Sequence, residues 1–503
     1  MSCTPSTADL WELLHLVLPR YLRITLKRAD ISFKRVIELL QHANENTIML
    51  QVPWMPSFIA IPGYESISKL SLDIGKDGVA IFPMDLASGV PPFMLTSDRG
   101  PQAPRKVLDL CCCPGGKFLM LSDHIDSEAT IVGIDVSQSR MNVTKSLVHK
   151  HLNAVYVSHS CQHLCPRMLL VRADGTTFSG DDRGELAYDS SIGLAEIERC
   201  GYKRKRNKSM RGREMRQLKD SWSAQANPLI VPDCLQKPKP SSSAVKDVAH
   251  TRVEEEEKIE GEWNGDGFFF GCFDAVLVDA QCTHDSSYRH LRYLSDNPAN
   301  SCIGDSNSRL KDVVWTNECR SYKNIGSVAS DESVYALQRD LIAKGFSCLA
   351  PGGELVYSTC SAEQEQNEDV VQWLLDKEKG NVEVVPVVDD WCGGCSSSDY
   401  LADKIDSALY RLVGLLSTQP PPYDELLNFL RQQLSCGPGL DSIHLLANEV
   451  CKHAASFQAA PGREGRLPGT AYFGMWACTS GLFVSRLRKL NTTTPQVVRT
   501  ETT

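Results

Sequence analysis

The chain has 503 residues, of which 42% are hydrophobic and 23% are charged, and its formal net charge is −9. This composition excludes a disordered chain, a collagen-like repeat and a small disulfide-stabilised protein, and the length is sufficient for two or three domains. We expect an intracellular protein without a membrane segment, because no apolar run approaches the roughly 18 residues of a membrane span and the first residues lack the layout of a secretion signal.

The first part of the chain, residues 1–95, is predicted to form a small mixed α/β subdomain. Residues 21–26 and 48–52 are typical of strands, and the apolar residues between positions 33 and 40 repeat at helical spacing. Arg and Lys side chains cluster around the first of these strands. Two interpretations of this cluster stay open, a surface that faces a polyanion and an ordinary solvated face.

From about Lys106, short apolar strands alternate with helical segments, a pattern typical of a parallel sheet with crossover helices. The expected strands are 107–112, 131–136, 168–173, 275–279 and 354–359, with helices at 137–150 and 333–349 and a closing strand at 481–487. The pattern predicts a doubly wound, mostly parallel α/β sheet that binds its ligands at the carboxyl ends of the strands. We assign residues 96–490 to this domain and 491–503 to a tail.

Two predicted insertions, 179–269 and 389–468, interrupt the alternating pattern. The first contains nine Lys or Arg residues between Lys203 and Lys219, followed by the acidic run at 254–257. Such blocks are typical of solvated segments, and the alternatives are a phosphate-binding arm or a nuclear-import signal at 203–206. We expect the first insertion to be largely disordered, the second to be partly helical, and the protein to be nuclear or cytoplasmic.

The first strand of the parallel series runs into a turn with two adjacent glycines, DLCCCPGGK at 109–117. Such a turn lets the backbone approach a ligand, and the helix after it offers free N–H donors, but the spacing matches neither the dinucleotide fingerprint nor the P-loop. The next two strands end in Asp135 and Asp174, whose carboxylates either bind a ribose hydroxyl and an adenine amino group or cap the next helix. Together these features favour an adenosine ligand, and without a phosphate cradle S-adenosylmethionine fits better than ATP.

Two cysteines follow neighbouring strands at the same edge of the predicted sheet. Cys282 comes three residues after Asp279, which ends the fourth strand, and Cys360 comes directly after the fifth. Taken singly, each cysteine has the properties of a small buried apolar residue. Their shared position beside Asp279 and the cofactor turn predicts covalent catalysis by a thiol.

In this order the motifs resemble those of the Sun (RsmB-like) family of S-adenosylmethionine-dependent RNA cytosine-5 methyltransferases. The resemblance covers roughly 80–178, 270–380 and the final strand, and it is carried by DLCCCPGGK, GIDVS, RADGT, LVDAQCT and VYSTCS. It implies a Rossmann-like class I methyltransferase domain, an N-terminal subdomain that contacts RNA, and RNA as the partner, with tRNA favoured over rRNA.

The resemblance also implies a role for individual residues. Cys360 would attack C6 of cytosine, Cys282 would assist release of the C5 proton, and Asp279 would contact the N3/N4 edge of an unstacked base. The residues implied for cofactor binding are Cys111, Cys112, Cys113, Pro114, Gly115, Gly116, Lys117, Asp135, Asp174 and Asp279. The chain departs from the family where Cys112 and Cys113 replace alanines and where Gln281 replaces a proline that sets the backbone beside the base.

Two other functions stay open. One is a catalytically weak, methyltransferase-like RNA-binding or assembly protein, for which Gln281 and the long insertion are the support. The other is a methyltransferase for a protein or a small molecule, which gives no reason for two thiols at these strand ends. The odd number of cysteines, 19, indicates reduced thiols, and the pairs Cys161/Cys165 and Cys392/Cys395 lack the paired spacing of a zinc site, so no metal is expected. The motifs do not define the oligomeric state.

Overall fold

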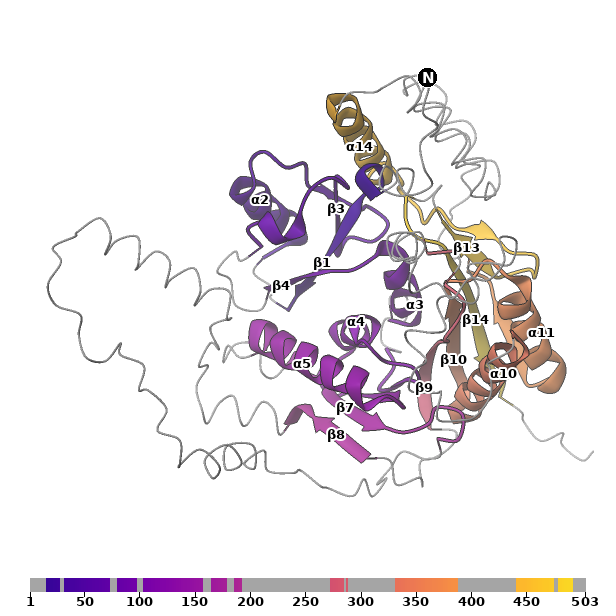
Figure 1. Ribbon diagram of the computed structural model, residues 1–503. Coiled ribbons are helices and arrows are strands. Elements are labelled where there is room, and N and C mark those ends of the chain that lie inside the picture. Colours follow the sequence, from indigo (N-terminus) through magenta and orange to yellow (C-terminus); the bar gives the residue numbers. More distant parts are fainter. Residues whose placement is uncertain are drawn as a thin grey trace, which may run out of the picture. The chain divides into compact units, whose positions relative to one another are not determined.

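The computed structural model describes residues 15–27, 31–72, 79–96, 103–156, 164–178, 185–191, 272–284, 286–287, 331–387, 440–474 and 478–491. These residues form two sheets with helices packed on them (Figure 1). Within these ranges, no helix is both long and apolar enough to cross a membrane. Most of the two predicted insertions, and all but the first residue of the predicted tail, lie outside the described residues.

The smaller sheet lies in the N-terminal part of the chain and is antiparallel. Its strand order is β2 (Leu50–Gln51), β3 (Phe58–Ile61), β1 (Arg20–Leu26) and β4 (Val79–Pro83). The helix α2 (Phe33–Ala43) begins after Ser32, whose side chain accepts a hydrogen bond from the Arg35 N–H. Its apolar side packs on this sheet, because Val36 and Leu40 are buried in one cluster with side chains of β1 and β3.

The larger sheet has the order β12–β13–β14–β10–β9–β5–β6–β7–β8, with β11 beside β14. Its five parallel strands are β7 (Arg167–Arg172), β6 (Thr130–Asp135), β5 (Lys106–Asp109), β9 (Phe273–Asp279) and β10 (Leu349–Thr359). Next to β10, β14 (Leu482–Lys489) runs antiparallel and pairs with β11 (Val382–Val385) and β13 (Ala471–Phe473), which in turn pairs with β12 (Arg463–Glu464). The predicted fold, a Rossmann-like, mostly parallel sheet, is confirmed.

Helices cover both faces of the larger sheet (Figure 1). On one face lie α3 (Leu86–Thr96), α4 (Gly116–His124) and α5 (Gln138–Val155), and on the other α10 (Asp331–Cys348) and α11 (Glu368–Lys377). Apolar side chains of the parallel strands, such as Val132 and Val276, are fully buried between these layers. Gly345 lets α10 approach the sheet closely, since a Cβ there would lie 2.7 Å from a methyl group of Val278.

Two details of the architecture differ from the sequence-based expectation. The strand β8 (Glu185–Asp189) lies inside the predicted insertion 179–269 and pairs antiparallel with β7. Its sequence lacks a continuous apolar run, because it is a partly exposed edge strand with an acidic residue at each end. The helix α3 crosses the expected boundary between residues 95 and 96 and packs against α4. Within the second predicted insertion, the described residues include the helix α14 (Leu440–Ala454).

A buried ion pair connects the smaller sheet to the helices of the larger one. Arg23 of β1 contacts Asp123 of α4, and their side chains are only 2% and 4% exposed. Thr25 Oγ1 donates to the same carboxylate at 2.6 Å, and His151 Nε2 lies 2.8 Å from its other oxygen. Burial acts to raise the pKa of Asp123, but His151 and Arg23 outweigh it and hold the pKa well below its usual value. Arg23 therefore belongs to this internal contact and not to a surface that faces a polyanion.

We expect Asp123→Ala to lower the free energy of unfolding by about 3–5 kcal/mol, because the substitution leaves the guanidinium of Arg23 buried without its counter-charge. Urea unfolding of the purified chain measures the loss. Glu38→Ala is the matched control, since its ion pair with Arg35 is about half exposed and is worth less than about 1 kcal/mol. Equal losses in the two variants would contradict the buried-pair interpretation.

Candidate functional site

The two cysteines predicted at neighbouring strand ends are in contact. The strands β9 and β10 are parallel neighbours with Asp279 paired to Ser358, so the loops after them meet at the same edge of the sheet. The Sγ atoms of Cys282 and Cys360 lie 3.2 Å apart, and the Cys360 N–H donates a hydrogen bond to Cys282 Sγ at 3.3 Å. Cys282 is buried and Cys360 is half-buried, so one of the two thiols remains accessible at the edge.

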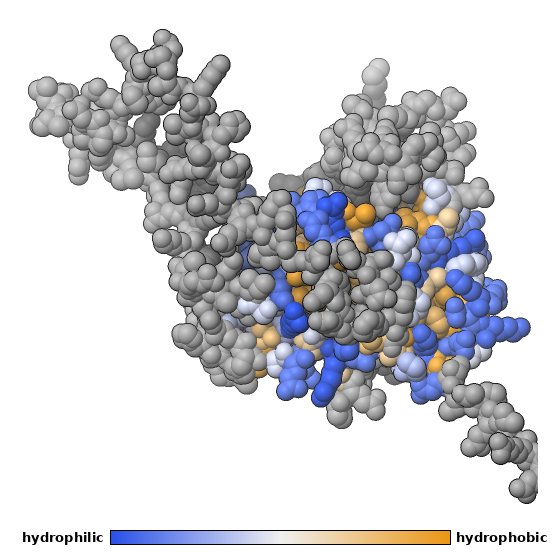
Figure 2. Space-filling view, turned by 90° about the horizontal axis from the view of Figure 1, so that it is seen from below, coloured by the Kyte–Doolittle hydropathy of each residue, from blue (hydrophilic) through white to orange (hydrophobic). Residues whose placement is uncertain are grey.

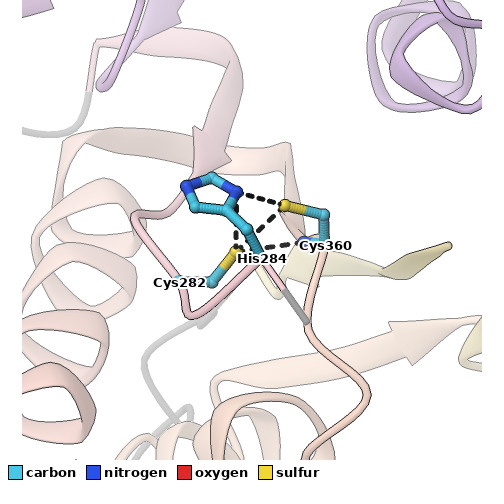
Figure 3. Close-up of side chains that lie close together, drawn as sticks. All are labelled: Cys282, His284 and Cys360. Carbon is cyan, nitrogen blue, oxygen red and sulfur yellow. Dashed lines mark hydrogen bonds between the residues drawn. The ribbon is translucent and has the colours of Figure 1, made fainter. Parts of the chain in front are cut away.

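A histidine that sequence reasoning missed completes this group (Figure 3). His284 Nδ1 lies 2.7 Å from Cys360 Sγ and 3.8 Å from Cys282 Sγ. Its backbone has a φ of 57°, in the left-handed region that residues other than glycine rarely adopt and that is found at functional sites. The only signal in the sequence was a histidine two residues after Cys282. We call Cys282, His284 and Cys360 the thiol cluster.

The two thiols of the cluster titrate as a pair. Burial opposes ionisation of Cys282, but the hydrogen bond from Cys360 and the neighbouring His284 outweigh it and lower the pKa of Cys282 to about 5. The hydrogen bond with Cys282, together with burial, raises the pKa of Cys360 well above its usual value. The contact between the two sulfur atoms therefore favours ionisation of one of them over the other.

Asp279 is fixed by two partners beside the thiol cluster. Lys117 Nζ lies 2.7 Å from its Oδ2, and Ser358 Oγ donates to its Oδ1 at 2.7 Å. Burial disfavours the charge on Lys117, but Asp279 outweighs this effect and raises the pKa of Lys117. Because Lys117 lies in the first turn of α4, this ion pair ties the predicted cofactor turn to the predicted catalytic strand.

The cofactor turn lies between β5 and α4. Gly115, which precedes α4, has a φ of 103°, and a Cβ there would lie 2.9 Å from Thr144 of α5, so only glycine fits. A Cβ on Gly116 would meet nothing within 4 Å, so the start of α4 faces open space. Cys112 and Cys113 are buried, and Thr144 Oγ1 lies 3.1 Å from Cys113 Sγ, which shows that these two cysteines pack in the interior.

Three acidic side chains end the strands around this turn. Asp135 is buried and accepts a hydrogen bond from the Ser137 N–H at 2.8 Å. Asp174 is exposed, lies two residues after the end of β7, and accepts from both the N–H and the hydroxyl of Thr176 in a turn rather than at the start of a helix. Asp109, which sequence reasoning did not select, is 1% exposed, and both of its oxygens lack a hydrogen-bond partner among the described residues. Burial and the nearby Asp279 raise the pKa of Asp109 to about 8, against the effect of Lys117.

Part of the chain is similar to known methyltransferases. The family described as 16S rRNA methyltransferase RsmB/F matches residues 318–394, which include Cys360. "Ribosomal RNA small subunit methyltransferase F" of Klebsiella pneumoniae (strain 342) is 34% identical over 137 residues, which are 26% of this chain and 23% of that protein. The protein of the same name from Escherichia coli O17:K52:H18 (strain UMN026 / ExPEC) is 36% identical over 129 residues, 25% of this chain and 21% of that protein. The chain thus spans less than a quarter of the length of these relatives, and over that part the predicted resemblance to the Sun (RsmB-like) family is confirmed.

Two solved structures from Pyrococcus horikoshii align with most of the chain at low identity. A methyltransferase homolog protein is 18% identical with a TM-score of 0.42, covering 95% of this chain and 89% of that one. NSun6 with SFG is 13% identical with a TM-score of 0.42, covering 96% and 94%. Because both scores are below 0.5, the fold assignment rests on the strand order.

The comparisons give no support to two finer predictions. The named relatives are bacterial, so they do not favour a nuclear location, and residues 203–206 lie outside the described part of the chain. Their names refer to ribosomal RNA, so they do not favour tRNA either.

Proposed function

We propose that this chain is an S-adenosylmethionine-dependent RNA (cytosine-5)-methyltransferase. The observation that carries the proposal is the contact between Cys282 and Cys360, 3.2 Å apart beside Asp279 at the carboxyl edge of the sheet. C5 of cytosine is a weak nucleophile until a thiolate adds to C6, so this reaction requires a thiol at the base. Transfer of a methyl group to an oxygen or nitrogen atom of a small molecule has no use for two adjacent thiols. The partial similarity to RsmB/F methyltransferases supports the same reaction.

The residues around the cofactor turn fit S-adenosylmethionine. Asp109 has a buried carboxyl group without a hydrogen-bond partner among the described residues, and the ammonium group of the amino-acid part would satisfy it. Asp135 would accept hydrogen bonds from the ribose hydroxyls, and Asp174 from the adenine amino group. Val136, 44% exposed directly after Asp135, offers an apolar contact for the adenine ring. When bound, the cofactor supplies an electrophilic methyl group.

The chain's own residues would perform the remaining steps. Cys360 Sγ adds to C6 of the base as a thiolate, with His284 Nδ1 at 2.7 Å to hold its proton, and the electron pair of the C5–C6 double bond becomes available at C5. Asp279, held by Ser358 and Lys117, faces the N3/N4 edge and stabilises the charge that develops there. After methylation, Cys282 accepts the C5 proton, the C5–H electron pair restores the double bond, and Cys360 leaves as a thiolate.

The departure from the family at Gln281 is compensated locally. Gln338 Nε2 donates to the Gln281 carbonyl at 2.8 Å and to Gln366 Oε1 at 3.1 Å, and both glutamine side chains belong to fully buried residues. Gln366 Nε2 in turn donates to Thr283 Oγ1 at 2.9 Å. The Thr283 N–H also donates to Gln366 Oε1 at 3.2 Å, so buried amides hold the backbone on both sides of Cys282, the task that the resemblance assigns to a proline. A catalytically weak RNA-binding or assembly protein therefore has little support from Gln281.

The substrate belongs to the same proposal. The names of the relatives make small-subunit ribosomal RNA the first substrate to test and tRNA the second. Residues 1–95 would contact RNA around the target base. Figure 2 shows hydrophilic and hydrophobic side chains interspersed on the face that it presents.

The experiment uses the full purified chain with methyl-labelled S-adenosylmethionine and unmodified small-subunit rRNA or tRNA. We expect label in one of the two RNAs, located at C5 of cytosine by mapping of the modified nucleotide. Label on another atom of the RNA would contradict the reaction proposed. Cofactor binding without label in either RNA, together with RNA binding, would favour the assembly protein.

A further inference from the structure

We propose that the thiol cluster binds one thiophilic divalent cation, Zn²⁺, and that the bound ion blocks the reaction. The blocking rests on the proposed function, whereas the binding site rests on geometry alone. Cys282, His284 and Cys360 each present one ligand atom toward the same point, and each pair of these atoms lies within 4.8 Å (Figure 3). Thiolate sulfur and imidazole nitrogen are the ligands that zinc prefers in proteins.

The three ligand atoms lie close enough together to share a single ion, and binding would spread the two shorter separations to the roughly 3.6–3.8 Å of tetrahedral zinc. Zinc binds cysteine sulfur at about 2.3 Å and histidine nitrogen at about 2.0–2.1 Å, so two atoms bound to one ion lie at most about 4.6 Å apart. The three separations in the cluster are 3.2 Å between the sulfur atoms and 2.7 Å and 3.8 Å from His284 Nδ1 to Cys360 and Cys282. Two thiolates and a neutral imidazole would balance the charge of Zn²⁺.

The surrounding backbone holds the three ligands in place. The Ser286 N–H donates to the Cys360 carbonyl at 3.1 Å, and the Gly481 N–H donates to the Ser286 carbonyl at 3.0 Å, so the loop after β9 is fixed against both β10 and the β14 segment. This loop holds His284 in its left-handed conformation. Preorganised ligands lose little conformational freedom when an ion binds, which favours affinity.

The cluster has the character of an open site rather than a structural one. It supplies three ligands, and structural zinc sites have four, so a fourth position is left for water. His284 and Cys360 are half-buried, which leaves a path for the ion. The nearby carboxylate of Asp279 is already engaged by Lys117 and Ser358, so we do not assign it as a ligand. We therefore expect reversible binding.

Bound zinc would stop methyl transfer, because coordination occupies the electron pair with which Cys360 attacks C6. Its removal by a chelator would restore the free thiolate. No metal was expected from the sequence, because its closely spaced cysteine pairs lack the arrangement of a zinc site. His284 and Cys360 are 76 positions apart, a separation that no short metal-binding motif includes.

The binding test uses the reduced, metal-free full chain, titrated with Zn²⁺ in competition with a chromophoric chelator. Because the chain has 19 cysteines, the informative quantity is the difference between variants. We expect wild type to bind one equivalent more than the Cys282→Ser/Cys360→Ser variant, and His284→Ala to weaken that site at least about 10-fold. The control is Cys348→Ser/Cys451→Ser, two buried cysteines outside the cluster, which should bind like wild type. Equal stoichiometry in wild type and the cluster variant would overturn the site.

Substitution of Co²⁺ for Zn²⁺ provides an independent signal. We expect a thiolate-to-cobalt charge-transfer absorption in wild type that disappears in the cluster variant and persists in the control. Mg²⁺, which prefers oxygen ligands, should not compete. An absorption that persists unchanged in the cluster variant would assign the ion to other cysteines.

The activity test separates this inference from the proposed function. We expect one equivalent of Zn²⁺ to reduce methylation at least about 10-fold and a chelator to restore it. Methylation that zinc leaves unchanged would overturn the blocking role while the proposed function stands. If the chain binds zinc but methylates neither RNA, the result supports the ion site and contradicts the proposed function.

Discussion

Replacing Cys360 with alanine is expected to lower kcat for RNA methylation by at least about 10⁴-fold, while binding of S-adenosylmethionine and RNA stays within about threefold. The thiolate of Cys360 is the group that makes C5 of cytosine nucleophilic, and Cys282, whose sulfur lies 3.2 Å away, is buried behind it. Alanine removes the sulfur without changing the backbone after β10, so the loss falls on the chemical step. Single-turnover methylation, with separate binding titrations, measures the two effects.

Cys348→Ala is the matched control for this prediction. Cys348 is also a buried cysteine, at the end of α10, and it lies outside the thiol cluster. We expect this variant to retain the wild-type rate. A Cys360→Ala enzyme that keeps more than about a tenth of the wild-type rate would exclude attack by this residue, and with it the mechanism proposed.

Replacing Cys282 with alanine is expected to trap the covalent intermediate, whereas replacing Cys360 prevents its formation. Addition of Cys360 to C6 and methyl transfer do not require Cys282, but removal of the C5 proton does. The variant should therefore accumulate a covalent protein–RNA complex that survives denaturation, while turnover falls by about 10²–10⁴-fold. Gel electrophoresis under denaturing conditions after incubation with RNA and S-adenosylmethionine detects the complex, and sequencing of the bound RNA identifies the target.

The double variant Cys282→Ala/Cys360→Ala decides which sulfur forms the bond. The complex should disappear in the double variant, because the nucleophile is absent. A complex that persists would show that another side chain is bonded to the RNA. If the Cys282→Ala variant turns over at the wild-type rate without any complex, another group removes the C5 proton, and His284 is then the first residue to test, since its Nδ1 lies 2.7 Å from Cys360.

The parallel sheet was predictable because its central strands are buried on both faces. Strands such as β6 and β9 therefore consist largely of apolar residues and contrast with the helices between them. The strand β8 was not predictable in this way, since it lies at the edge of the sheet and begins and ends with acidic residues, of which Glu185 is exposed. The role of Arg23 was not predictable either, because the sequence does not show whether an arginine is buried. Only the folded chain brings Asp123, and through it His151, to this side chain.

Local apolar patterns and short motifs were enough to establish the sheet, the turn at 109–117, and the position of Cys282, Cys360 and Asp279 at its carboxyl edge, because each strand and its end are encoded by neighbouring residues. The contacts of these residues were accessible only in the folded chain. The contact of His284 with Cys360, the support of Gln281 by Gln338, and the burial of the Asp109 carboxyl depend on how loops and helices distant in the chain pack together. Contacts across such separations arise from packing and backbone hydrogen bonds, which leave no periodic signal in the sequence.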